Sequence, residues 1–401
     1  MKDTWAQSQG EGVTVAVIDS GVDGSHPDLR GQVLEGRDYT GGGDAQEDKI
    51  GHGTRMASLI AAHGHGPGNS SGMIGFAPKA KILPLRTLQG KADKNLDETW
   101  APAVRYAVDK GAKVINLSFG DEYSKTGSDG REAIAYAQQR DVIVVAATGN
   151  HGGGVAEPAA LPGVVAVGAV DKEANLWESS ATGKQVTLTA PGVDILAANK
   201  TRAQGYGIAS GTSDATALVS ATAALVRAKY PDLTAGQVIN RLVKSASFLG
   251  HKGLTAPDEE YGYGIIRPNK ALTMDIPKGP KEGPLEQLPS GTESKAGGAS
   301  AGGDDGSTQA KEKDSSSSGL PLPLIIGGIA AVVIVGGIIF AVMRTRRNRG
   351  GGGPGPGGPG GGMGYPPNQN QPYPTAAQGQ QYPTPPGQAP QQHNPYGGQG
   401  Q

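Results

Sequence analysis

The stretch "GVTVAVIDS" at residues 12–20 indicates the fold most directly. It is a short, valine-rich apolar run that ends in a glycine turn, a pattern typical of a buried parallel strand. Similar runs follow it along the chain at residues 80–87, 112–120, 141–150 and 163–170. The chain therefore predicts a sheet built from several buried strands.

Helical patterns lie between these runs. Residues 96–111 place four apolar side chains on one helical face: Trp100, Val104, Ala107 and Val108. Asn95 and Gly111 suit the start and the end of this helix, and Thr234 with Gln237 has the spacing of a capping box. Strands that alternate with such helices predict an α/β fold, a doubly wound and mainly parallel sheet with helices on both faces. Ligands of such sheets bind at the carboxyl ends of the strands.

Composition excludes several classes of function. Of the 401 residues, 66 are glycine and 29 are proline, and they concentrate in the last third of the chain. The formal net charge of -1 predicts no binding to nucleic acid, and the absence of cysteine excludes disulfides and thiolate metal sites. We expect no cofactor or metal. The acidic loop 41–50, with Asp44, Glu47 and Asp48, is read either as a solvated loop or as a calcium site without visible ligand periodicity.

The composition changes after a globular domain of residues 1–275. Residues 276–319 lack apolar periodicity, which predicts a disordered linker. The uncharged residues 320–343 would form a helix about 36 Å long, enough to cross a bilayer core of about 30 Å. A buried core helix is the alternative, but the flanking segments offer nothing to bury it. Residues 344–401 form a basic flank and a Gly/Pro/Gln-rich tail that we expect to be disordered.

The basic flank predicts the orientation in the membrane. The arginines of "RTRRNR" at residues 344–349 indicate that this end faces the cytoplasm. Residues 1–319 would then lie outside, in a single-pass protein of the cell membrane. Export of that domain needs a signal sequence, and the opening "MKDTWAQSQGEG" contains none. We therefore expect a start upstream of residue 1 or a processed chain.

Three polar residues stand at the ends of predicted strands or the starts of predicted helices. Asp19 ends "VAVID", His52 lies in "GHGTRMASLIAAH", and Ser213 lies in "SGTSDATALVSATAALVRAKYPDL". Taken singly, the aspartate suits a turn, and the histidine and the serine suit helix caps. Together they follow the order Asp, His, Ser, with separations of 33 and 161 residues.

These stretches resemble the signatures of the subtilisin-like serine proteases, and the resemblance covers residues 4–272. The motifs appear as "DSGVDGSHPDL", "GHGT" and "GTS", and a fourth, "AATGN", ends in Asn150. The resemblance implies that Ser213 is the nucleophile, His52 its general base and Asp19 the group that orients the imidazole. It also implies that the Asn150 amide and the backbone N–H of the serine stabilise the oxyanion.

A further match, "NLSFG" at residues 116–120, resembles the substrate-binding strand of the family. Ser118, Phe119 and Gly120 would pair with an extended polypeptide substrate as an added strand. A side chain at Gly120 would crowd the incoming backbone. The alternative is an ordinary strand end.

The chain departs from the family pattern after the serine. The family usually has an apolar residue there and a proline three positions further on, where this chain has Asp214 and Ala217. Alanine suits a helix interior. A carboxylate at a helix N-terminus is favourable, but one directed at the oxyanion would oppose the charge being stabilised. We expect Asp214 to point away from the cleft and favour an active enzyme. The alternative is a slowed or inactive protease retained for binding.

The order of segments narrows the resemblance. A subtilisin-like domain, a linker, one membrane helix and a basic flank are similar to the mycosins, membrane-anchored proteases of type VII secretion. The resemblance implies a partner in the secretion membrane complex and secreted or complex-associated substrates. The mycosin signal and N-terminal extension are not seen here. The competing hypotheses are a structural subunit that docks partners and a soluble cytoplasmic protease; the uncharged segment argues against the latter.

Overall fold

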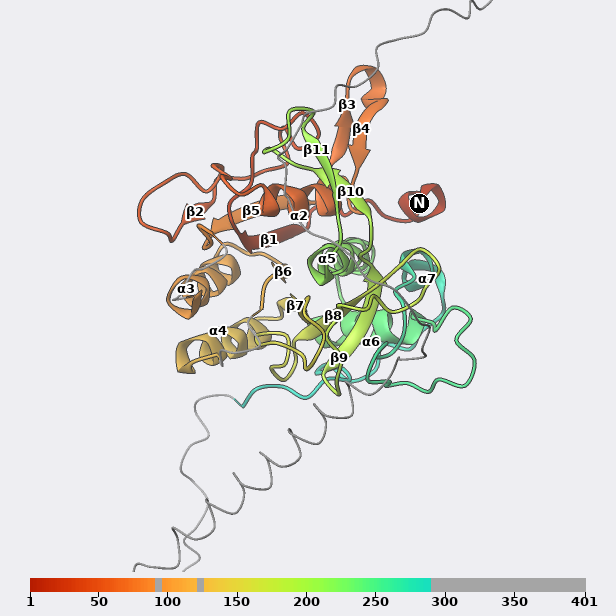
Figure 1. The fold of residues 1–401 in the computed structure, drawn as a ribbon. Helices are drawn as coiled ribbons and strands as arrows, with labels where there is room; N and C mark the ends of the chain where they lie inside the picture. Colours follow the sequence, from red (N-terminus) through yellow and green to blue (C-terminus); the bar gives the residue numbers. More distant parts are fainter. Residues whose placement is uncertain (91–95, 121–125, 290–401) are drawn as a thin grey trace, which may run out of the picture. The chain divides into compact units, whose positions relative to one another are not determined.

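A computed structural model of the protein describes residues 1–90, 96–120 and 126–289. Its main strands are β1 (Thr14–Asp19), β2 (Arg37–Asp38), β5 (Lys81–Arg86), β6 (Val114–Leu117), β7 (Ile143–Ala147), β8 (Val165–Val170) and β9 (Val186–Pro191). They form one sheet in the order β2-β5-β1-β6-β7-β8-β9, and every neighbouring pair is parallel (Figure 1). The five predicted strands are confirmed, whereas the sequence patterns do not indicate β2 and β9.

The strand order reverses at β1, and this reversal places the site. The chain runs from β1 outward to β2 and β5 on one side and then crosses to β6 on the other side. A reversal of this kind opens a crevice at the carboxyl ends of the strands beside it. Asp19 is the last residue of β1, and Ser118 directly follows the last residue of β6. The crevice therefore lies between residues of two motifs.

Helices cover both faces of the sheet (Figure 1). They are α1 (Lys2–Trp5), α2 (His52–Ala61), α3 (Leu96–Asp109), α4 (Ser128–Gln139), α5 (Thr212–Lys229), α6 (Ala235–Ser245) and α7 (Pro268–Thr273), with a 3-10 turn at Pro67–Asn69. Val15 and Val17 of β1 belong to a hydrophobic cluster with residues of α2, α5 and α6. Ala16 and Ile18 belong to a second cluster with residues of α3 and α4. Because β1 is buried on both sides, the doubly wound α/β fold is confirmed.

Two predicted helices have the expected local chemistry. The four apolar residues of the predicted face of α3, from Trp100 to Val108, are buried. Helix α6 begins with the predicted capping box: Gln237 N donates to Thr234 Oγ1 at 3.2 Å, and Thr234 N donates to Gln237 Oε1 at 3.1 Å. Reciprocal bonds of this kind satisfy donors that a helix start would otherwise leave free.

Helix α5 is buried continuously from Thr212 to Arg227. Its alanine, serine and threonine side chains are small, which lets the sheet approach it closely. The buried hydroxyls of Thr216 and Thr222 donate to the carbonyls one turn earlier in the helix, at 2.7 and 2.8 Å. The first turn of α5, which carries Ser213, is therefore held by packing on all sides.

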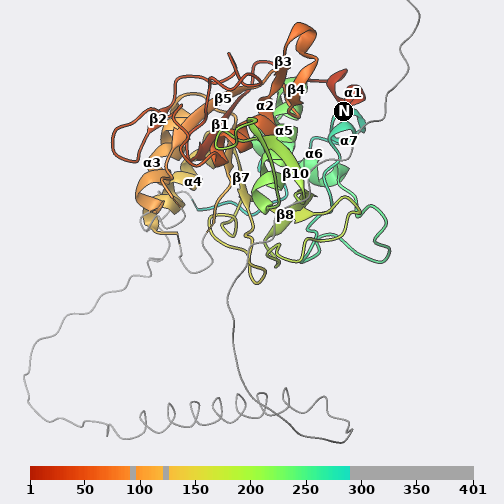
Figure 2. The same cartoon turned by 45° about the horizontal axis from the view of Figure 1, so that its top comes forward.

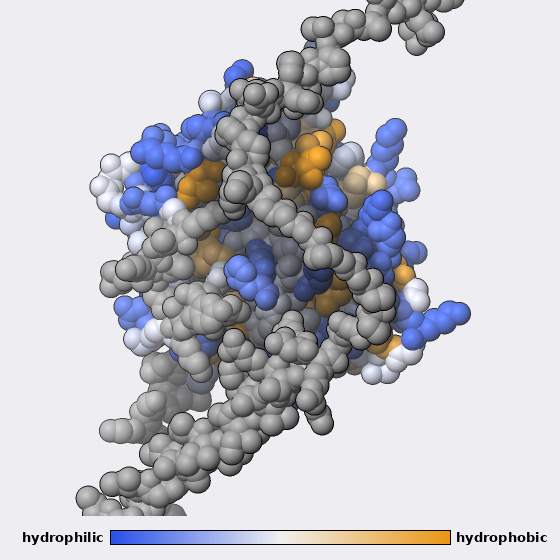
Figure 3. All heavy atoms as spheres, viewed as in Figure 1, coloured by the Kyte–Doolittle hydropathy of each residue, from blue (hydrophilic) through white to orange (hydrophobic). Residues whose placement is uncertain are grey.

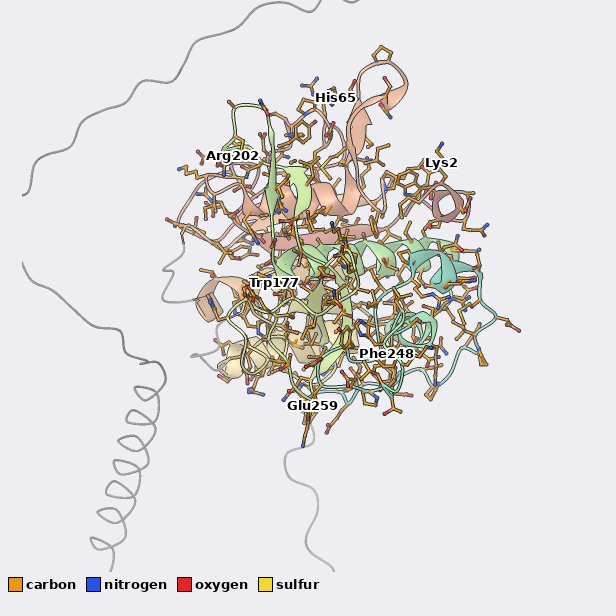
Figure 4. All side chains as sticks on the ribbon, turned by 45° about the vertical axis from the view of Figure 1, so that its right-hand side comes forward. Lys2, His65, Trp177, Arg202, Phe248 and Glu259 are labelled. Carbon is orange, nitrogen blue, oxygen red and sulfur yellow. The ribbon has the colours of Figure 1, made fainter. Side chains whose placement is uncertain are left out.

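Two antiparallel hairpins stand beside α2 (Figures 1 and 2). They are formed by β3 (His63–His65) with β4 (Ser71–Ile74) and by β10 (Ile195–Ala198) with β11 (Tyr206–Ala209). The fully buried Asp28 joins them: it accepts hydrogen bonds from Tyr206 Oη at 2.7 Å and Met73 N at 2.9 Å, and it contacts His65 Nδ1 at 2.5 Å. His65 is labelled on the first hairpin in Figure 4.

Loss of one donor to Asp28 should destabilise the fold. Burial raises the pKa of Asp28, but hydrogen bonds from His65, Met73 and Tyr206 outweigh it and hold this pKa below its ordinary value of 3.8. Tyr206→Phe should lower the free energy of unfolding by about 1–3 kcal/mol in urea denaturation at neutral pH. Because the native pKa of Asp28 is lowered, its contribution is present above pH 3.8 and is lost as the pH falls through the native pKa. An unchanged unfolding midpoint would contradict this account.

The start of the expected linker packs against the domain. Thr234 Oγ1 donates to the carbonyl of Lys281 at 2.7 Å, and Leu288 N donates to Gln138 Oε1 at 3.1 Å. A side chain at Gly236 would meet the backbone of Glu282 at 2.3 Å, so this close approach requires glycine. The prediction of disorder from residue 276 is therefore wrong for residues 276–289, because side chains of α4 and of the start of α6 bind the backbone of a segment that has no periodicity of its own.

The predicted membrane helix, residues 320–343, lies outside the described residues, as does the tail 344–401. Within the part of the chain that the structure describes, no helix combines the length and apolarity needed to cross a membrane. The described surface in Figure 3 mixes hydrophilic side chains with separate hydrophobic patches.

Candidate active site

Asp19 and His52 form a close pair. Asp19 is fully buried at the end of β1, and His52 is the first residue of α2, with 32% of its side chain exposed. The His52 Nδ1 atom lies 2.9 Å from each carboxylate oxygen of Asp19. Because a carboxylate only accepts hydrogen bonds, Nδ1 must carry a proton, and Nε2 of the neutral ring is left to act as a base.

A second buried carboxylate, Asp48, fixes the start of α2. It accepts hydrogen bonds from Gly51 N at 2.7 Å, Thr54 N at 2.8 Å, Thr54 Oγ1 at 2.6 Å and Ser20 Oγ at 2.8 Å. These bonds use the free N–H groups of the first helical turn, at which His52 stands. The structural role of Asp48 is therefore to place the imidazole.

The acidic side chains of residues 41–50 are engaged by protein groups. Both oxygens of Asp48 are occupied by protein donors, and Glu47 pairs with Lys49 at 3.4 Å and Arg86 at 3.3 Å. Among residues 1–90, 96–120 and 126–289, no group of three or more histidine, aspartate or glutamate side chains is arranged to hold a metal ion.

The carboxylates around His52 change its basicity. Burial alone would lower the pKa of His52, but the charge and the hydrogen bond of Asp19, together with the charges of Asp214 and Asp48, raise this pKa to about 8. The ring is consequently a stronger base than an ordinary histidine.

This basicity predicts the pH dependence of the reaction. His52 must be neutral to accept a proton, so kcat/KM should rise with pH and level off above an apparent pKa of about 8. A profile of peptide hydrolysis across the neutral and alkaline range measures it. An acidic limb at the ordinary histidine value of 6.5 would show that the carboxylates do not act on the ring in this way.

Ser213 lies at the start of α5 with 8% of its surface exposed. Its hydroxyl donates to the carbonyl of Ser118 at 3.0 Å, and the Ser118 hydroxyl donates back to the carbonyl of Ser213 at 3.1 Å. The structure thus joins the serine to the end of β6 and not, in this rotamer, to His52.

Asn150 follows β7 and faces the start of α5. Its Oδ1 accepts from Thr212 N and from Thr212 Oγ1, each at 2.8 Å. Because the backbone N–H can only donate, these bonds fix which end of the amide is oxygen and leave Nδ2 as its donor end. Asn150 therefore has a defined orientation beside Ser213.

A cavity of about 140 Å³ brings several motif residues together. It is lined by Ser118, Phe119, Gly120, Ala147, Thr148, Gly149, Asn150, His151, Gly152, Gly154, Ala156, Ala181, Thr212 and Ser213. A side chain at Gly120 would meet the Cβ atom of Ala156 at 3.0 Å, a tighter contact than most Cβ atoms make, so the protein wall leaves little room for a larger residue there. All three proposed substrate-binding residues lie beside the serine and the amide.

The whole site falls within one family match. The model of the subtilase family matches residues 10–264. The chain belongs to the subtilase family. As a subtilase, it has the catalytic class of a serine endopeptidase.

Curated relatives match this subtilase over more than half of its length. The thermophilic serine proteinase of Bacillus sp. (strain AK1) is 40% identical over 224 residues, which cover 55% of this chain and 54% of that protein. Thermitase of Thermoactinomyces vulgaris is 37% identical over 226 residues, which cover 55% of this chain and 77% of thermitase. This chain thus spans about half the length of the first relative.

Solved structures extend the likeness to mycosins. MycP1 from Mycobacterium smegmatis matches the subtilase with a TM-score of 0.61 and 28% identity, covering 73% of this chain and 86% of MycP1. The MycP3 protease from the type VII (ESX-3) secretion system matches with a TM-score of 0.59 and 32% identity, covering 68% and 86%. The predicted mycosin resemblance is therefore supported for the peptidase domain.

Asp214, the departure from the family pattern, is turned away from the cavity of this subtilase. It is 2% exposed, and its Oδ1 accepts a hydrogen bond from Arg55 Nε at 2.7 Å. The carboxylate is therefore engaged by a cation and is not among the groups that line the cavity. The sequence analysis missed Arg55, although its place one turn after His52 in "GHGTR" was visible.

Proposed function

We propose that this protein is a membrane-anchored serine endopeptidase, associated with type VII secretion, that cleaves polypeptides through an acyl-enzyme on Ser213. The observation that carries the peptidase proposal is the Asp19–His52 contact of 2.9 Å at the crevice where Ser213 and Asn150 line one cavity. The contact supports an oriented base, and the cavity supports a hydroxyl and an amide donor beside one another.

The reaction begins when the Ser213 hydroxyl leaves the Ser118 carbonyl by rotation about its Cα–Cβ bond, which has three staggered positions. Its oxygen attacks the scissile carbonyl while His52 Nε2 takes the proton. Asn150 Nδ2 and the Ser213 backbone N–H donate to the oxyanion. The C–N bond then breaks as His52 returns the proton to the leaving amine, and water releases the acyl group by the same steps.

The cavity predicts the class of side chain bound before the scissile bond. Among the described residues, half of its lining residues are glycine or alanine, and no carboxylate, lysine or arginine contributes to it. Burying an unpaired charge there is costly. We therefore propose that small uncharged side chains are preferred, with the adjacent substrate backbone paired along Ser118, Phe119 and Gly120.

A series of chromogenic peptides that differ only at this position tests the peptidase proposal. Alanine should give the highest kcat/KM, and arginine or aspartate should lower it at least ~10-fold. A protein that labels with a phosphonate but prefers arginine would contradict the pocket assignment. A protein that neither hydrolyses nor labels would contradict the peptidase function itself.

The proposals of a membrane anchor and of an association with secretion rest on other observations. The uncharged residues 320–343 and the basic residues 344–349 support an anchor with the peptidase domain outside, and the likeness to MycP1 and MycP3 supports the type VII association. Membrane fractionation of the full chain and of a chain lacking residues 320–343 tests the anchor. Recovery of both chains in the soluble fraction would contradict it.

The secretion role is tested by measuring secretion in two strains. One carries Ser213→Ala, and the other carries the chain without residues 320–343. We expect the second change to impair secretion, and normal secretion in both strains would contradict the association. One ground for the competing hypothesis of an inactive subunit was a carboxylate directed at the oxyanion, and the bond of Asp214 to Arg55 counts against that ground. A subunit that docks partners remains the alternative, and this role is compatible with an active peptidase.

A further inference from the structure

Arg55 is the centre of a buried polar junction. It lies three residues after His52 in α2 and is 5% exposed. Its Nε donates to Asp214 Oδ1 at 2.7 Å. Its two terminal nitrogens donate to the carbonyls of Gly207 at 2.9 Å, Ile195 at 2.5 Å and Ala209 at 3.2 Å. One side chain therefore binds α5 and both strands of the β10–β11 hairpin.

Arg55 and Asp214 depend on one another because their opposite charges are both buried. A guanidinium stays protonated inside a protein, so a buried arginine needs a negative charge beside it. The hairpin carbonyls satisfy N–H donors but carry no net charge. Within the described residues, Asp214 is the carboxylate in contact with Arg55. Burial raises the pKa of Asp214, and the charge of Arg55 opposes this rise.

Stability alone does not explain such a pair. The cost of removing two charges from water offsets much of their attraction, so buried ion pairs are a weak source of stability. The position of this pair is more informative. Arg55 stands one turn after His52, and Asp214 directly follows Ser213, although the two are 159 residues apart in the chain. The contact joins the helix starts that carry the base and the nucleophile.

The hairpin adds a third element to the junction. Strand β11 ends at Ala209, four residues before Ser213, and the hairpin lies beside α2 in both views (Figures 1 and 2). By holding the carbonyl of Ala209, Arg55 restrains the segment that leads into the nucleophile. A small shift of that segment changes the distance over which the proton must move.

We propose that Arg55 and Asp214 are positioning residues for peptide hydrolysis, a pair that fixes His52 and Ser213 relative to one another. This inference rests on the serine peptidase function proposed above. Asp214, the residue at which this chain departs from the family pattern, would then contribute to catalysis by holding Ser213 in position.

Asp214 also acts on the electrostatics of the base. The charged groups that face His52 are Asp19 from β1, Asp48 from the loop before α2 and Asp214 from α5, with Arg55 on its own helix. All three carboxylates raise the pKa of the imidazole. Asp214→Asn removes one of them and leaves the positive charge of Arg55, so the pKa of His52 should fall.

The test compares Asp214→Asn with Asp141→Asn in the full chain. Asp141 pairs at 2.9 Å with Arg227, which lies near the opposite end of α5, so its variant is a control for loss of a carboxylate from an ion pair with the same helix. Activity is measured with a chromogenic peptide below the unfolding midpoint of each variant and is normalised to sites that react with a phosphonate.

For Asp214→Asn we expect kcat to fall at least ~10-fold, because the change disturbs the geometry of proton transfer. KM should change less than ~3-fold, because the residues of the substrate pocket are unchanged. The acidic limb of its kcat/KM profile should move to lower pH. Asp141→Asn should keep the wild-type kcat and pH profile. Equal kcat and pH profiles in the two variants would overturn the proposal.

Arg55→Lys keeps the test informative if Asp214→Asn does not fold. Lysine retains the charge beside Asp214 but lacks the planar fork that reaches the hairpin carbonyls. We expect a folded protein with a reduced kcat and an acidic limb at the wild-type pH. A wild-type kcat in Arg55→Lys would overturn the positioning role. Absence of hydrolysis in the wild-type protein would instead contradict the proposed function.

Discussion

Ser213→Ala should abolish peptide hydrolysis. In subtilisin, loss of the nucleophile lowers kcat by about 2 × 10⁶-fold, and a loss of that order is expected here because Ser213 supplies the oxygen of the proposed acyl-enzyme. The fold should persist, since the change removes one hydrogen bond to the Ser118 carbonyl, worth about 1 kcal/mol. Hydrolysis of a chromogenic peptide and thermal unfolding measure the two effects separately.

Ser220→Ala is the matched control for this change. Ser220 is a buried serine of the same helix, and its hydroxyl donates to Asn116 Oδ1 at 2.9 Å outside the cavity. The Ser220→Ala variant should unfold at a lower temperature than the wild type and retain the wild-type kcat. Residual hydrolysis by Ser213→Ala within tenfold of the wild type would contradict the assignment of the nucleophile.

Asn150→Ala should also give a large loss of kcat. Removal of the equivalent amide donor from subtilisin costs about 10²–10³ in kcat, because the donor acts on charge that develops in the transition state. The same range is expected here, with a much smaller change in KM. Steady-state kinetics over a range of substrate concentrations separates the two constants.

Thr212→Val is the control for the structural part of the Asn150 effect. It removes the hydroxyl that binds Asn150 Oδ1 but keeps both the backbone bond to that atom and the amide donor. Its loss of kcat should be clearly smaller. A loss equal to that of Asn150→Ala would assign the effect to the packing of this loop.

Local patterns were sufficient to predict the central architecture. The strands that the apolar runs predicted are buried on both faces, and the Thr234–Gln237 box forms as its spacing requires. The pairing of Asp19 with His52 followed from the resemblance of their motifs to those of the subtilisin-like proteases, and the contact between the two side chains agrees with it. The strands and the capping box are set by residues close together in the chain, so a single sequence is enough to predict them.

Contacts between distant segments could not be predicted in the same way. Arg55 and Asp214 each resemble an ordinary surface charge until the fold brings α2 and α5 together. Residues 276–289 have no periodicity, and only their hydrogen bonds to α4 and α6 show that they belong to the domain. The rotamer of Ser213, which faces the Ser118 carbonyl, likewise follows from the packed site.

The central claim is that His52 activates Ser213 under the control of Asp19. Phosphonate labelling of the full wild-type chain, followed by mass mapping of the modified peptide, tests it most directly. We predict one adduct per chain on Ser213, with labelling lost in His52→Ala. An adduct on another residue, or undiminished labelling of Ser213 in His52→Ala, would contradict the account.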